Sequence, residues 1–181
     1  MRRQEAFLFP RGMIKQAQVY DTEKKGSDMN RQSQIQMTPE EQAEYLKHAR
    51  TMILCTIDKD GYPHAVAMAF LVKDGCIYMT SFRKAQKVVN ARRNPKVAVL
   101  VESGLKYNDL RGVMIRGNCE IIDDADEVWK IMREVRASQD GGTAAPTNAV
   151  IQERAKKRAV LKITPTKVSS WDHSKLPPDT Y

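Results

Sequence analysis

Two hydroxyl side chains and three cations lie close together between residues 80 and 87. Thr80 and Ser81 end a run of β-forming residues, and a helical period of apolar residues begins at residue 84. The cations are Arg83, Lys84 and Lys87. A helix start is partially positive and usually carries acidic residues, yet this one carries only bases. Hydroxyls, free N–H groups and Lys or Arg at a helix start are typical of a phosphate site, and a solvated basic face is the alternative.

Other arrangements of reactive side chains do not occur in the sequence. His48, His64 and His173 lie in unrelated segments without the spacing of metal ligands, so no metal site is expected. Ser81 lacks the GxSxG context of a nucleophile, and neither a Cys–His pair nor a paired-carboxylate motif can be assigned. No catalytic residue is identified. Such a chain, if it holds a phosphate site, suits a protein whose chemistry belongs to a bound cofactor.

The elements that must position this stretch are mostly strands. Two apolar segments, 51–57 and 62–72, are joined by a short Asp/Gly turn and predict a β-hairpin. In the second segment larger residues alternate with Ala65, Ala67 and Ala69, so one face of the strand is a row of alanines. A flat ligand lying close to the backbone explains this row, and so does a helix packed on it.

The remaining elements complete an α+β pattern. We expect further strands over 76–80, 96–102 and 111–122, and a closing strand over 159–171 that is interrupted at Pro165. Gly112 and Gly117 are expected to mark bulges or close backbone contacts. Short helices are expected over 39–50, 84–93, 125–137 and 150–157. For the helix over 84–93, the buried stripe is expected to include Val88, Val89 and Arg92. Antiparallel strands in hairpin order with a few helices predict a barrel-based α+β fold.

Composition narrows the class of protein and its compartment. The chain has 181 residues, 41% of them apolar, which suits one domain, and a formal net charge of +8. This charge fits nucleic acid, an anionic membrane or a phosphorylated ligand, but no nucleic-acid-binding motif is present, so nucleic acid stays a minor alternative. Three widely spaced cysteines indicate reduced thiols and a cytoplasmic protein, and no apolar run is long enough to span a membrane. We expect a polar tail over 1–36 and a folded domain over 37–181.

Four pieces of the sequence occur in the order found in one known family. They are the hairpin Leu54–Ile57 with Asp60–His64, the stretch Tyr78–Ser81 followed by Lys87–Asn90 and Arg92–Pro95, the run Leu110–Gly117, and the ending Ser170–Leu176. Together they resemble the pyridoxamine 5′-phosphate oxidase-like flavin and deazaflavin oxidoreductases. The resemblance covers roughly Met37 to Leu176 and implies a split β-barrel, a homodimer and a cofactor at the subunit interface.

The resemblance also implies which residues contact the cofactor. Thr80, Ser81 and Lys87 match positions that bind the phosphate, with Arg83 or Lys84 assisting. The strand from Ala65 to Met68 matches the segment along which the isoalloxazine ring lies, and Trp171 is expected to reach the ring from the partner subunit. The full set of expected contacts is Ala65, Val66, Ala67, Met68, Thr80, Ser81, Arg83, Lys84, Lys87, Arg111 and Trp171.

One departure from the family argues against oxidation of vitamin B6. The oxidase has an arginine in the strand after the first hairpin and a C-terminal arginine motif, where this chain has His64–Met68 and Trp171–Lys175. The leading hypothesis is an FMN-dependent oxidoreductase that transfers a hydride between the flavin and a small organic substrate. The alternatives are a reductase that uses an 8-hydroxy-5-deazaflavin coenzyme, a flavin-binding protein without turnover, and a basic nucleic-acid-binding protein.

Overall fold

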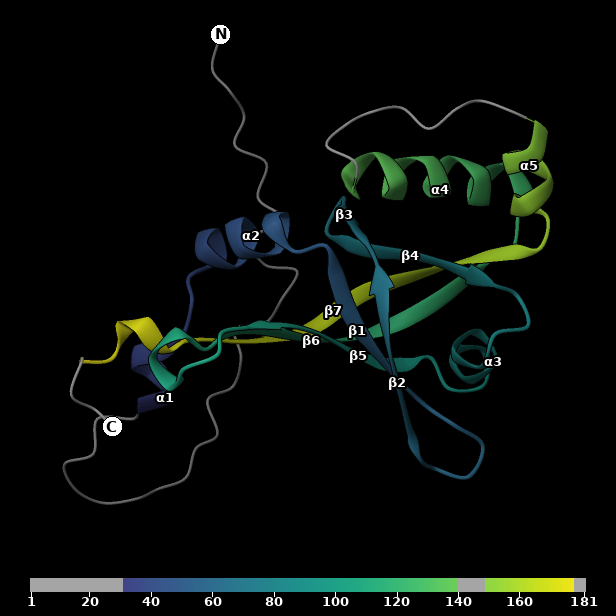
Figure 1. The fold of residues 1–181 in the computed structure, drawn as a ribbon. Helices are drawn as coiled ribbons and strands as arrows, with labels where there is room; N and C mark the ends of the chain where they lie inside the picture. Colours follow the sequence, from purple (N-terminus) through teal and green to yellow (C-terminus); the bar gives the residue numbers. More distant parts are fainter. Residues whose placement is uncertain (1–30, 140–148, 178–181) are drawn as a thin grey trace, which may run out of the picture.

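A computed structural model describes residues 31–139 and 149–177, and this part of the chain forms one curled antiparallel sheet with helices around it (Figure 1). The seven strands are β1 Thr51–Ile57, β2 Pro63–Ala69, β3 Leu71–Lys73, β4 Cys76–Phe82, β5 Lys96–Ser103, β6 Arg111–Ile122 and β7 Arg158–Asp172. The helices are α1 Arg31–Ile35, α2 Pro39–His48, α3 Gln86–Arg93, α4 Ala125–Gln139 and α5 Ala149–Ala155, with short 3-10 turns at Tyr107–Asp109 and His173–Lys175.

The sheet has the order β2-β1-β5-β6-β7-β4-β3, and every neighbouring pair is antiparallel. Alternate residues of each strand point into the curl, where Leu54, Val99 and Ile115 are fully buried in one apolar core. The hairpin pairs Leu54 with Val66, so the larger residues of the second strand face the core, as their alternation with alanines predicts. The α+β split β-barrel expected from the sequence is therefore confirmed.

Four helices pack on three different parts of this barrel. α2 begins at the capping box of Thr38 and Glu41, whose side chains and backbone N–H groups bond reciprocally, and its Leu46 reaches the core. α4 and α5 lie together on one side of the sheet, over β3 and β4 (Figure 1), and form a second apolar cluster there with β7. α3 lies at one end of the barrel, where it buries Val88 and Ala91.

The buried face of α3 differs from the stripe expected from the sequence. Val89 is 48% exposed and Arg92 is exposed, whereas Asn90 is only 1% exposed. A helix of eight residues offers two overlapping stripes at helical spacing, and the sequence pattern does not distinguish them. Asn90 can be buried because its amide donates to Thr56 of β1 and accepts from Gln86, one turn earlier in α3.

Two strand boundaries also differ from expectation. The segment expected as one strand over 62–72 turns at the buried Phe70, which separates β2 from β3. β7 continues through Pro165 instead of stopping there. Pro165 pairs with Gly117 at a register shift between Arg116 and Gly117, so the bulge expected at Gly117 accommodates a residue without an N–H group.

The segment expected as a polar tail is described only from residue 31 onward. Its last part contains α1, which contacts β7 and the 3-10 turn that follows it, and Lys175 donates to the carbonyl of Gln36 at 2.9 Å. Residues 1–30 lie outside the described residues. Within the described ranges, no helix is both long and apolar enough to cross a lipid bilayer.

Candidate functional site

The end of β4 and the start of α3 place Ser81 and Lys87 side by side. The Lys87 ammonium lies 3.4 Å from the Ser81 hydroxyl, and Ser81 is 6% exposed. Ala85 at the N-cap provides no side-chain cap, and the first turn of α3 holds no acidic residue. Cation, hydroxyl and uncapped helix start therefore meet at one point. These groups are donors that suit a phosphate and lack a carboxylate that would repel it.

Two of the other expected phosphate contacts, Thr80 and Arg83, point elsewhere. Thr80 pairs with Val160, which packs under α4, so strand alternation places its side chain on the face opposite Ser81. Arg83 donates to the carbonyl oxygens of Arg158 and Asp123, the first bond being 2.9 Å, and so ties the corner before α3 to neighbouring segments. The Lys84 side chain is exposed.

The strand β2 presents the alternation expected from the sequence. Ala65 and Ala67 are exposed, whereas Val66 and Met68 pack against the main core. A ligand on this strand would therefore touch the alanine side, and Val66 and Met68 could offer it only their backbone. Cross-strand pairing aligns residues of β2, β1, β5 and β6 into one apolar row across the sheet. The row consists of Ala67, Ile53, Leu100 and Met114.

Arg111 and Trp171 lie together near the far end of β6 and β7. Trp171 pairs with Gly112, and a Cβ at Gly112 would overlap the indole, so the close backbone contact expected at this glycine is confirmed. The Arg111 guanidinium lies 3.1 Å from the Asp172 carboxylate and donates to the Ser174 hydroxyl. Burial would raise the pKa of Asp172, but hydrogen bonds from Ser174 and the charge of Arg111 outweigh it and lower the pKa.

The structure thus brings the expected residues together in two groups. Ser81 pairs with Ala159 near the start of β7, and Trp171 follows twelve residues later in the same strand. At about 3.3 Å per residue this is about 40 Å of strand, and the two ends of β7 lie far apart in Figure 1. Within one chain, Ser81 and Lys87 are therefore separated from Arg111 and Trp171.

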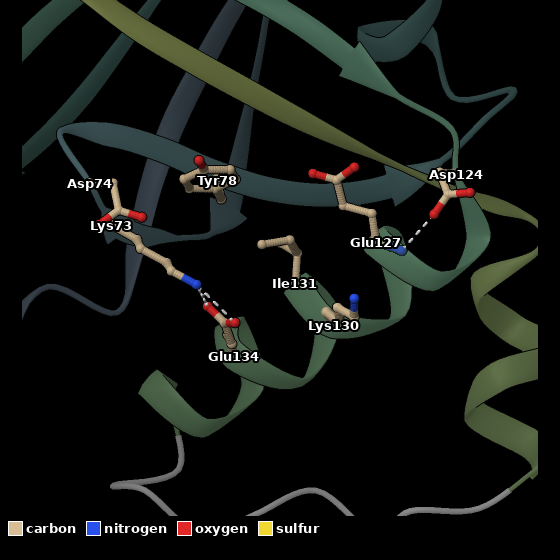
Figure 2. Close-up of a pocket in the computed structure, with 8 residues that line it drawn as sticks. All are labelled: Lys73, Asp74, Tyr78, Asp124, Glu127, Lys130, Ile131 and Glu134. Carbon is tan, nitrogen blue, oxygen red and sulfur yellow. Dashed lines mark hydrogen bonds and ion pairs between the residues drawn. The ribbon is translucent and has the colours of Figure 1, made fainter.

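A pocket of about 370 Å³ lies on the other side of β4, between α4 and the β3–β4 hairpin (Figure 2). It is lined by Lys73, Asp74, Tyr78, Asp124, Glu127, Lys130, Ile131 and Glu134. None of these residues belongs to the expected cofactor contacts. Among the lining residues, the Lys73 ammonium bridges to the Glu134 carboxylate at 2.8 Å, and this bond raises the pKa of Lys73.

Cysteine and metal chemistry receive no support from the described ranges. All three cysteines are free, and burial raises the pKa of Cys119 to about 12, so its thiol stays protonated. Among the side chains that the structure describes, no group of three or more His, Cys, Asp or Glu is placed to hold a metal ion.

The curled sheet with α3 at its end is the split barrel of a known class of proteins. The family model for pyridoxamine 5′-phosphate oxidase matches residues 38–172, and the chain belongs to this family. The resemblance seen in the sequence is thereby confirmed. None of the curated proteins matches the chain by sequence.

Solved structures extend this result. A conserved hypothetical protein of Mycobacterium tuberculosis is 34% identical, with a TM-score of 0.73, and the match covers 82% of this chain and 94% of that one. An F420 reductase is 26% identical over 70% of this chain and 94% of that one, with a TM-score of 0.57. A FAD-binding protein of Mesorhizobium loti, 22% identical over 75% and 94% with a TM-score of 0.55, shows the shared fold.

Two polar residues near this site were missed by sequence reasoning. Thr56 in β1 and Asn90 in α3 are each 1% exposed and bonded to each other. The signal for Asn90 was an amide next to the apolar positions Val88 and Ala91 of a short helix, where a polar residue is unusual unless it has a buried partner. Nothing in the alternation of β1 distinguishes Thr56 from an ordinary strand threonine.

Proposed function

We propose that this protein binds FMN and acts as a flavin-dependent oxidoreductase on a small organic substrate. The observation that carries the proposal is the meeting of Lys87, Ser81 and the uncapped start of α3 in a chain of this family. Lys87 and Ser81 would hold the phosphate, with the N–H groups of the first helical turn. When bound, the flavin supplies the hydride chemistry, while the chain binds and orients it.

The exposed alanine side of β2 suits the flat part of this cofactor. Ala65 and Ala67 add little bulk above the backbone, so an aromatic ring can approach the strand closely. β2 begins at the hairpin turn near α3, where His64 pairs with Thr56 of β1, and runs from there across the barrel. A cofactor anchored at Lys87 would extend along this side.

We further propose a homodimer in which each subunit completes the other's site. The apolar row is partly exposed in one chain, since Met114 at its end is 36% exposed, and a second copy would cover it. Arg111 and Trp171 lie at the opposite end of β7 from Ser81, so the same chain cannot bring them to its own phosphate site. A partner subunit could supply them.

The absorbance spectrum of the purified protein tests the proposal. A flavin spectrum that survives desalting, together with light scattering at twice the chain mass of 20.6 kDa, is expected. Reconstitution of the colourless protein with FMN gives the same answer if the cofactor is lost during purification. A monomer that binds FMN with high affinity would refute the shared site, and failure to bind FMN at all would refute the proposal.

A deazaflavin coenzyme is the second candidate, and the match to an F420 reductase at 26% identity favours it. Both cofactors carry a phosphate attached through a ribityl chain to a flat tricyclic ring, so the same residues would serve either one. Parallel titrations with FMN and with the deazaflavin coenzyme separate the two, since the resident cofactor should bind at least tenfold more tightly. A protein that binds either cofactor but oxidises or reduces no substrate would be a carrier.

A further inference from the structure

Three hydrogen-bonded polar side chains, of which Asn90 and Thr56 are buried and Gln86 is exposed, form a chain from α3 into the hairpin. Asn90 donates from its amide nitrogen to the Thr56 hydroxyl at 3.1 Å, and Gln86 donates to the Asn90 carbonyl oxygen at 2.7 Å. The Thr56 hydroxyl in turn lies 3.5 Å from the backbone oxygen of His64. The chain therefore links the first turn of α3 to β1 and β2.

The position of this chain is unusual for an ordinary core. Asn90 and Thr56 are each 1% exposed, and Asn90 lies between Val88 and Ala91, which face the apolar barrel. A buried amide or hydroxyl is unfavourable unless it is hydrogen-bonded, whereas an apolar side chain of similar size would fill the same space without this demand. The polar chain must therefore be intact in the folded protein.

Hydrogen bonds constrain α3 in a way that apolar packing does not. Val88 and Ala91 alone would tolerate a small rotation or slide of a two-turn helix, because dispersion contacts have little directionality. Within the core, the bond from Asn90 to Thr56 sets the rotation of α3 and its height above β1, while Arg93, which donates to the Ile57 carbonyl, ties the last turn of the helix. Gln86, the far end of the chain, is the residue directly before Lys87.

We propose that Asn90 is a positioning residue for the phosphate site. Through Thr56 it holds α3 so that Lys87 and the N–H groups of the first turn face Ser81, and the same chain holds the β2 end that follows the hairpin. This inference rests on the proposed function for the identity of the ligand, but the positioning itself is a property of the ligand-free protein.

Hydrogen exchange on the ligand-free protein tests the positioning. Asn90→Leu keeps the number and branching of the side-chain heavy atoms and removes both bonds. It is expected to accelerate exchange at least tenfold in the α3 amides and in Pro63–Ala69, while the paired strands β5 and β6 stay unchanged. Asn118→Leu, at an exposed position in β6, is the matched control. Unchanged exchange in α3 would overturn the inference. If Asn90→Leu does not fold, Thr56→Val, which keeps the side-chain shape, takes its place.

A ligand titration tests the consequence for the site. Loss of these hydrogen bonds should weaken FMN binding by roughly 3- to 10-fold, the equivalent of one neutral hydrogen bond. Riboflavin binding should weaken by a smaller factor, because β2 is also held by its ladder with β1. Because Asn90 acts through α3, adding Asn90→Leu to Lys87→Ala should weaken FMN by less than the product of the two single losses. Equal losses for both flavins, or simple additivity, would overturn the inference. If the wild-type protein binds neither flavin, the proposed function fails while the exchange experiment still decides the positioning.

Discussion

Replacing Lys87 by alanine tests the phosphate site most directly. The ammonium lies 3.4 Å from the Ser81 hydroxyl, longer than the roughly 2.7–2.9 Å of a strong charged hydrogen bond, so it is free to turn to a better acceptor. A hydrogen bond to a charged group contributes about 1.5–3 kcal/mol. At about 1.4 kcal/mol per factor of ten, Lys87→Ala should weaken FMN binding by roughly 10- to 150-fold.

Titration with two ligands separates a lost phosphate contact from a damaged fold. Riboflavin has the ring of FMN without the phosphate, so its affinity should hardly change in Lys87→Ala. Quenching of flavin fluorescence measures both affinities at fixed ionic strength. Lys130→Ala, which removes one charge from α4 at the pocket on the far side of β4, controls for the change in net charge and should leave both affinities unchanged.

The assignment would be refuted by two results. If Lys87→Ala weakens FMN and riboflavin equally, Lys87 supports the fold and not the phosphate. If FMN affinity is unchanged, the phosphate binds elsewhere. A loss in Lys130→Ala as large as that in Lys87→Ala would show that net charge, and not a local contact, governs binding.

Three further outcomes follow from the structure. Asp172→Ala should lower the free energy of unfolding by about 1–3 kcal/mol in urea, because the carboxylate accepts from Ser174 and pairs with Arg111. Since folding lowers the pKa of Asp172, its stabilisation is present above the unfolded-state pKa of about 3.9 and disappears as the pH falls below it, so wild type and variant should converge in acid. Cys55 is half-buried on the same face of β1 as Ile53 of the apolar row, so in the proposed dimer at pH 8 maleimide should leave it unlabelled. Dilution to monomers should expose it, while the buried Cys119 stays unreactive in both states.

Much of the fold was predictable because its signals are local. The capping box at Thr38 and Glu41, the Asp/Gly turn of the hairpin and the alternation of β2 each act within a few residues. Where sequence reasoning failed, a distant partner decided the outcome. Pro165 stays within β7 because the register shifts beside it, where Thr166 has no pairing partner and Pro165 lies opposite Gly117 of β6. No pattern around Pro165 reveals that neighbour.

The candidate site was predictable in part for the same reason. Ser81 and Lys87 are six residues apart on a strand and the helix that follows it, so their proximity is a local result. The opposite orientation of Thr80 follows from strand alternation, which an argument from the pair of hydroxyls ignores. The partners of Arg83 come from residues 40 and 75 positions away, and sequence alone gives no means of finding them.

The separation of the two residue groups constrains any function of this fold. β7 is hydrogen-bonded to β4 at one end and to β6 along most of its length, so it cannot fold back to bring Trp171 to Ser81 without breaking these ladders. Trp171 is also held against Gly112, where a Cβ would collide with the indole. A ligand that engages both ends must therefore bridge two chains. In the proposed homodimer we expect cofactor binding to quench the fluorescence of Trp171. Trp171→Phe should remove this quenching and leave the emission of Trp129 in α4, and quenching confined to Trp129 would refute the bridging arrangement.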